Sequence, residues 1–94
     1  MKILYVGLKY DYGNINNGYS FEHLNFYNSL ANMKEVKKLD YLAIDEVLKK
    51  NGKHYLNHEI INKTKKNGYD LIFFFIFKNE FFTQTLEFLK KDLS

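Results

Sequence analysis

The strongest constraint on the fold is an unbroken apolar run, Leu71 to Phe77. A strand with apolar side chains on both faces is typical of a parallel sheet that is covered by helices on both sides. The run is also far shorter than the roughly 20 residues that a helix needs to cross a bilayer. We therefore expect it to be a buried strand of an α/β domain.

A strand and a helix are predicted in the first third of the chain. Lys2–Val6 is rich in β-forming residues and stops at Gly7. Ser20 is a good N-cap for the helix, and Glu22 complements the dipole of its first turn. Placing residues 21–33 at steps of about 100° gathers the apolar residues on one arc. The predicted inward residues are Leu24, Phe26, Tyr27, Leu30, Ala31 and Met33.

The remaining segments also alternate between strand and helix patterns. A strand is predicted over 36–42, and a short helix over 45–50 is ended by Asn51-Gly52. A longer helix, ended by Asn67-Gly68, would bury one stripe of side chains, and a terminal helix would bury another. The first stripe is Leu56, Ile60 and Thr64, with Ile61 beside it; the second is Phe82, Leu86, Leu89 and Leu93.

The resulting element order is β-α-β-α-α-β-α, which favours a parallel sheet with right-handed crossovers. We expect a three-layer, Rossmann-like α/β sheet of order 2-1-3, in a single domain over 1–94. The third strand would then be an apolar edge, which exposes unpaired backbone groups and promotes aggregation. The sheet is therefore expected to be incomplete, as the first part of a larger domain.

Composition excludes several kinds of site. The chain has 94 residues and contains no cysteine, which excludes disulfides, thiolate nucleophiles and zinc–thiolate sites. Its net charge of +3 comes from lysines spread along the sequence, without arginine. Specific recognition of phosphates and bases relies on the arginine fork, so nucleic-acid binding is not supported. The start of the chain lacks the long apolar region of a signal peptide, so a cytoplasmic location is expected.

Residues 8–20 form a long loop after the first strand, rich in tyrosine and asparagine. Ligands of open α/β sheets bind beyond the carboxyl ends of the strands, where this loop would lie. Its residues Lys9, Tyr10, Asp11 and Tyr12 could bind a sugar or a nucleotide by ring stacking and hydrogen bonding. The alternative is a loop that packs its own tyrosines. The turn 77–80 is expected to face the loop across a crevice.

Two motif-like spacings carry no prediction of a site. Gly13 and Gly18 are spaced as in a phosphate-binding P-loop, but the lysine that should precede Ser20 is Tyr19. His54 and His58 lie one helical turn apart without a third ligand nearby in the sequence, so an exposed pair is expected rather than a metal site.

His23 is the candidate catalytic residue. It falls inside the apolar arc of the first helix, in the turn that points at the expected crevice. A histidine there could orient a ligand hydroxyl or act as a general base, because its pKa lies near neutrality. The alternative is a buried histidine bonded to a backbone carbonyl. Asp11 and Glu22 are its expected acidic partners.

Two parts of the chain together resemble a known family. A glycine-closed strand, an aromatic loop and the helix start Ser-Phe-Glu-His are followed later by an apolar strand and Asn-Glu-Phe. The residues are 2–7, 9–13, Gly18, 20–23, 25–27, 70–75 and 79–81. This combination resembles the amino-terminal segment of CgeB-like glycosyltransferases, a family named for a spore-maturation protein and related to the two-domain GT-B transferases.

The resemblance implies transfer of a sugar from a nucleotide-sugar donor to an acceptor, without a metal or another cofactor. In GT-B enzymes the amino-terminal domain shapes the acceptor side, and a carboxy-terminal domain holds most donor contacts. The chain would then be an acceptor-side portion that is inactive alone and lacks that second domain. By this resemblance the residues expected to line the cleft are Tyr10, Asp11, Gly13, Ser20, Glu22 and His23.

A free-standing α/β interaction or regulatory module is the alternative. A phospho-receiver is disfavoured, because it needs acidic residues after the first strand, where Gly7-Leu8-Lys9 stands. A flavin-binding domain would need a Ser/Thr/Gly-rich loop at the same place. A simple binding module remains open.

Overall fold

The computed structural model describes residues 1–75 and 80–93 and contains a three-stranded parallel sheet. The strands are β1 (Lys2–Gly7), β2 (Lys38–Ala43) and β3 (Leu71–Phe74), in the order β2-β1-β3. Tyr5 at the centre of β1 is level with Tyr41 of β2 and Phe73 of β3. The predicted order 2-1-3, with an apolar third strand at an edge, is confirmed.

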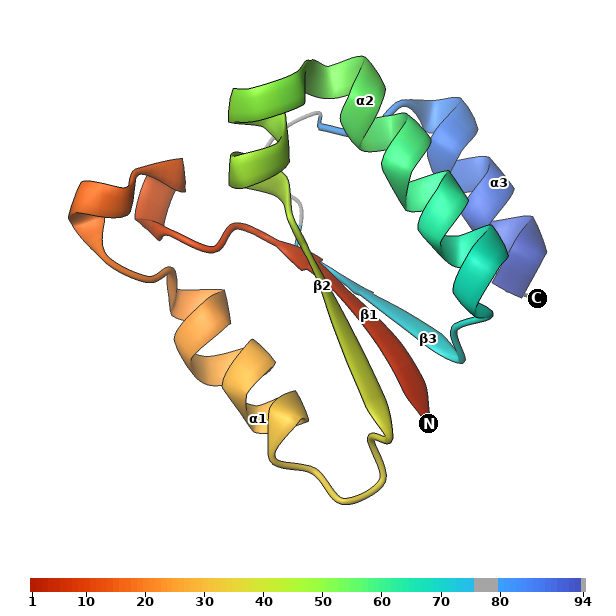
Figure 1. The fold of residues 1–94 in the computed structure, drawn as a ribbon, viewed down its shortest axis with the longest axis horizontal. Helices are drawn as coiled ribbons and strands as arrows, with labels where there is room; N and C mark the ends of the chain where they lie inside the picture. The colour runs from red at the N-terminus through yellow and green to blue at the C-terminus, as the bar shows by residue number, and fades with distance from the viewer. Residues whose placement is uncertain (76–79, 94) are drawn as a thin grey trace.

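Helices lie on both sides of the sheet, which gives three layers (Figure 1). On one side a π-helical turn, His23–Tyr27, runs into α1 (Asn28–Ala31). On the other side lie α2 (Ile44–Asn67) and α3 (Thr83–Leu93), which pack against each other. No helix within 1–75 and 80–93 is long and apolar enough to span a membrane.

The face of the sheet toward α2 and α3 carries an aliphatic core. Alternate β1 residues, Leu4 and Val6, are fully buried there, and Leu56 and Ile60 of α2 cover them. Thr64 is also buried and donates its hydroxyl to the carbonyl of Ile60 at 2.8 Å. The predicted stripe of Leu56, Ile60 and Thr64 is therefore confirmed.

The opposite face is built from aromatic rings. Tyr5 is fully buried at its centre, and the rings of Tyr27 and Tyr41 meet the Tyr5 ring edge-on at 5.4 and 5.0 Å between centroids. Phe73 and Phe75 lie on its other side, at 6.2 and 6.1 Å. These two phenylalanines are only half-buried, so this face is less completely covered than the aliphatic one.

The first helix differs from its prediction. The helical turns end at Ala31, before Met33. Three large residues predicted to point inward are exposed instead: Leu24 at 52%, Phe26 at 38% and Met33 at 48%. The π turn shifts the register of the helix: the amide of Asn28 donates to the carbonyl of His23, five residues earlier. Asn25 and Asn28 also donate side-chain hydrogen bonds to carbonyls four residues back, which competes with the α-helical pattern.

The break predicted at Asn51-Gly52 is confirmed as a kink inside α2. Gly52 adopts φ +87° and ψ 177°, which glycine tolerates better than other residues. The strand predicted over 36–42 begins and ends slightly later, as β2.

The apolar run pairs as β3 over Leu71–Phe74, and the amide of Phe75 donates to the carbonyl of Val6 at 2.8 Å. Leu71 is 43% exposed and the other β3 residues are half-buried, so this edge strand is less buried than expected. The end of the run and most of the turn, 76–79, lie outside the described residues.

The apolar stripe of α3 is also corrected in part. Leu89 is buried, as expected, but Leu86 is 37% exposed, and Thr85 takes a buried position instead. Phe81, just before the helix, joins the aliphatic core.

Candidate functional site

The loop 8–20 is ordered by hydrogen bonds within itself. The amide of Asp11 donates to the carbonyl of Gly18, and that of Ser20 donates to the carbonyl of Lys9, both at 2.9 Å. Tyr10 and Tyr19 face each other across this short hairpin, whose tip contains two 3-10 turns, Asp11–Gly13 and Ile15–Asn17. The loop therefore packs two of its own tyrosines, Tyr10 and Tyr19, against each other.

Asp45, at the start of α2, fixes the hairpin to the end of the sheet. One of its carboxylate oxygens accepts from the amide of Lys9 and the other from that of Tyr10, each at 3.0 Å. Asp45 is buried, so these two bonds are shielded from water. Two backbone amides that could cradle a phosphate after the first strand are thus occupied by a side chain of the protein.

Ser20 joins the loop to the helix. Its hydroxyl donates to the carbonyl of Leu8 at 2.5 Å and accepts from the amide of His23 at 3.1 Å. The predicted N-cap is confirmed. Because Ser20 is 2% exposed, its hydroxyl serves this internal connection.

Four rings form a continuous stack from the hairpin to the sheet. Tyr10 stacks on Tyr19 with centroids 5.6 Å apart, Tyr19 on His23 at 4.5 Å, and His23 on Tyr27 at 5.2 Å. Neighbouring ring planes are within 17° of parallel. The imidazole of His23 is therefore held between two tyrosine rings and cannot tilt freely.

The hydrogen-bond partner of His23 is Tyr41, the residue at the centre of β2. The His23 Nδ1 and Tyr41 Oη atoms are 3.0 Å apart. The Tyr41 hydroxyl takes the place of the backbone carbonyl that was the alternative partner. Among the residues that the structure describes, neither Asp11 nor Glu22, the expected acidic partners, is hydrogen-bonded to the ring. Burial raises the pKa of the Tyr41 hydroxyl, which stays protonated. Burial, and then the positive charge of Lys9, lower the pKa of His23, so its imidazole is neutral at pH 7.

A pocket of about 330 Å³ opens beside this pair at the carboxyl ends of β1 and β2. At its rim Lys9 Nζ and Glu46 Oε1 form an ion pair at 3.3 Å. This contact raises the pKa of the Lys9 ammonium. The lining residues are Lys9, His23, Tyr27, Tyr41, Ala43 and Glu46. The pocket therefore combines ring faces, a neutral imidazole and one charge of each sign.

The structure brings some predicted site residues to this pocket and places others elsewhere. Lys9 and His23 line it. Tyr10 is stacked on the far side of Tyr19 from His23 and lines a neighbouring hollow of about 190 Å³ with Gly13. Tyr12 and Gly13 line a third hollow together with Glu80. Glu80 is the last residue of the turn 77–80 that was expected to face the loop, and the structure describes no other residue of that turn. Asp11 is exposed in the hairpin. Glu22 is half-buried, and its negative charge adds to the effect of burial in raising the pKa of Tyr5.

Three residues of the site were not singled out by the sequence analysis: Tyr41, Asp45 and Glu46. Asp45 and Glu46 directly follow the second strand, whose carboxyl end in a parallel sheet lies beside that of the first, so a search at both strand ends would have found them. Tyr41 lies at the centre of the strand, and no such signal marks it.

The histidine pair on α2 remains outside the site. His54 and His58 are exposed, and the His54 ring lies 5.2 Å from that of Phe82. Across the described part of the chain, no three His, Cys, Asp or Glu side chains cluster in a way that could hold a metal ion.

Comparison of the chain with models of known protein families, with curated proteins and with solved structures gives no match.

Proposed function

We propose that this chain is the acceptor-side portion of a Rossmann-like glycosyltransferase, with His23 as the general base. The observation that supports this most is the His23–Tyr41 pair, at 3.0 Å, on the wall of an open pocket at the carboxyl ends of β1 and β2. Ligands of parallel sheets bind at this edge. The nucleotide-sugar donor would be held by a second domain, as the resemblance to CgeB-like transferases implies.

The chemistry of the pocket suits a sugar acceptor. Tyrosine rings offer an apolar face for the C–H groups of a sugar ring. The carboxylate of Glu46 can accept hydrogen bonds from sugar hydroxyls, and the ammonium of Lys9 can donate them. The pocket carries both charges rather than one, which favours a neutral ligand.

His23 would take the proton of the reacting hydroxyl. If its Nδ1–H donates to the Tyr41 oxygen, Nε2 is left with a lone pair that can accept a proton. The acceptor oxygen then bonds to the anomeric carbon of the donor sugar, whose bond to the nucleotide diphosphate breaks and leaves its electron pair on the diphosphate. Because the pKa of His23 is lowered, the base is already unprotonated at pH 7.

A binding module without catalysis is the second candidate. It is favoured by the hairpin, whose hydrogen bonds and anchor at Asp45 all lie within this chain. A module that functions alone should unfold in one cooperative transition as a monodisperse protein. A portion of a larger domain should show a broad transition and self-association.

Binding is the first test, because turnover is not expected without a donor domain. We would titrate the ¹⁵N-labelled chain with methyl β-glucoside, cellobiose and maltose and follow amide shifts by NMR. Shifts are expected at Lys9, His23, Tyr41 and Glu46. His23→Ala should weaken binding at least 10-fold, whereas His58→Ala, on the exposed face of α2, should not. Equal affinities for the two variants, or shifts confined to other surfaces, would reject this assignment of the site.

A further inference from the structure

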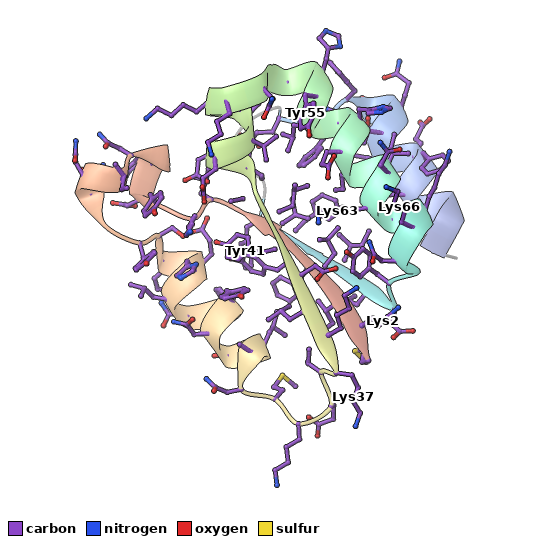
Figure 2. The ribbon with its side chains drawn as sticks, in the orientation of Figure 1. Lys2, Lys37, Tyr41, Tyr55, Lys63 and Lys66 are labelled. Carbon is purple, nitrogen blue, oxygen red and sulfur yellow. The ribbon has the colours of Figure 1, made fainter. Side chains whose placement is uncertain are left out.

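A second hollow adjoins the pocket of His23. It has a volume of about 340 Å³ and lies between α2 and β2, the edge strand of the β2-β1-β3 sheet. Tyr55, Glu59 and Lys63 line it from α2, and Leu42 lines it from β2. Figure 2 shows Tyr41 on one side of β2 and Tyr55 and Lys63 on the other.

The two hollows adjoin each other at the end of β2. Tyr41, Ala43 and Glu46 line both of them. A ligand that is long enough to pass the end of β2 can therefore contact both His23 and Lys63. The two volumes are nearly equal, so the second hollow can hold as large a ligand unit as the first.

The lining of the second hollow has the chemistry of the first. Its charged residues are Glu46 and Glu59, balanced by Lys50 and Lys63. Balanced charges favour a neutral ligand with many hydroxyl groups over a polyanion, for which a single positive sign is needed. Tyr55 is 44% exposed and offers a ring face on this surface, as Tyr27 and Tyr41 do in the pocket of His23.

We propose that the acceptor is an extended, neutral oligosaccharide. Its reacting end lies at His23, and its following units cross the edge of β2 and stack on Tyr55. This inference rests on the proposed function and adds the length and charge of the acceptor to it. It assigns Tyr55 as a residue that recognises acceptor length, away from the reacting hydroxyl.

The test compares ligands of increasing length. Affinities of the chain for methyl β-glucoside, cellobiose and cellotetraose, and for the corresponding maltose series, would be measured by calorimetry. In at least one series we expect the tetrasaccharide to bind at least 10-fold more tightly than the shortest sugar. Tyr55→Ala should remove most of this gain and leave the affinity for the shortest sugar unchanged. Tyr55→Phe, which keeps the ring, should retain the gain, and His58→Ala on the same helix is the matched control.

The outcomes separate the two proposals. If short and long sugars bind equally and shift the amides of His23 and Tyr41, the extended acceptor is rejected and the proposed function stands. If no sugar of either series shifts those amides, both are rejected. Preferential binding of a sulfated polymer such as dextran sulfate in the same groove would overturn the assignment of a neutral ligand.

Discussion

The two faces of the sheet are made by neighbouring residues of one strand and differ in what they do. Leu4 and Val6 of β1 point into an aliphatic core that α2 and α3 close. Tyr5, between them, points into a layer of rings whose outer members remain half-exposed. Side chains alternate across a strand, so a single strand can supply a dry core on one side and a ring-lined site on the other.

The two faces of the sheet also differ in their polar groups and in their contact with the pocket. Among the described residues, the buried side-chain hydroxyl that lacks a partner, that of Tyr5, lies on the aromatic face rather than the aliphatic one. The aromatic face also carries the His23–Tyr41 pair and leads to the pocket. We therefore expect substitutions on the aliphatic face to alter stability most, and those on the aromatic face to alter the site with smaller changes in stability.

The largest effect is expected from Leu56→Ala. Leu56 is fully buried in the aliphatic core. Truncation of a buried leucine removes its contacts and leaves a cavity, at a cost of about 2–5 kcal/mol. Urea denaturation followed by circular dichroism measures the loss. Phe26→Ala is the matched substitution on the aromatic face; Phe26 is 38% exposed, so its truncation should cost clearly less. Equal losses of stability in the two variants would show that the two faces of the sheet do not differ in their contribution to stability.

Asp45→Ala should have the next largest effect, because Asp45 connects the hairpin to the sheet. The variant leaves the amides of Lys9 and Tyr10 without their acceptor, at a cost of about 1–3 kcal/mol. Hydrogen exchange at these two amides should accelerate together with the loss in stability. Asp45→Asn keeps one carbonyl acceptor and should cost less. If exchange at Lys9 and Tyr10 is unchanged in the alanine variant, Asp45 does not anchor the loop.

Tyr5→Phe should stabilise the protein. The Tyr5 hydroxyl is buried and, within the described residues, has no hydrogen-bond partner. Removing a buried polar group that lacks a partner is expected to add about 1 kcal/mol to the free energy of unfolding. Tyr41→Phe is the matched control, since it deletes a hydroxyl that is bonded to His23, and it should destabilise. A loss of stability in Tyr5→Phe would show that this hydroxyl is bonded in solution.

The same buried tyrosine explains Gly7. A Cβ atom at this position would lie 3.2 Å from the Tyr5 ring and hydroxyl, closer than ordinary packing allows. A larger residue at the end of β1 would therefore have to displace the Tyr5 ring by a few tenths of an ångström.

Much of the fold follows from local pattern. The apolar run at Leu71, the glycine at 52 and the stripe at Leu56 each reflect a requirement of one segment. The structure confirms the break at Gly52 and the stripe, and it confirms a strand over Leu71–Phe74, although this edge strand is less buried than expected. Leu24 was placed wrongly because the 100° step assumes a regular α-helix, and the π turn after Glu22 changes the step.

The site was less predictable for a different reason. His23 and Lys9 could be selected as candidates from their residue types and positions in the sequence. The hydrogen-bond partner of His23, however, depends on the register between β1 and β2, which sets Tyr5 beside Tyr41. Register is decided by the packing of three strands and cannot be read from one of them. Asp45 illustrates the same limit, because its role depends on the path of a loop 35 residues earlier in the chain.

Acidification should lower the stability of the protein through protonation of His23 on the aromatic face. Its pKa is lowered in the folded protein, so below the ordinary value of about 6.5 the unfolded state binds the proton more readily. Stability is then full above that value and falls as the pH drops toward the folded-state pKa. Urea denaturation at pH 7.5 and at pH 5.5 measures the difference. His23→Gln should reduce it, and an unchanged pH dependence in that variant would assign the effect to other groups.

The smallest change in stability is expected from Phe21→Ser, in contrast to the large loss expected from Leu56→Ala. Phe21 is 68% exposed and touches the aromatic layer through an edge-on contact with Phe26, at 6.0 Å between centroids. Substitutions at such positions usually change stability by less than about 0.5 kcal/mol. Exposed apolar side chains nevertheless promote association, so the variant should self-associate less in sedimentation experiments. A large loss of stability would show instead that the aromatic layer extends over Phe21, and the two faces would then differ less in burial than the structure indicates.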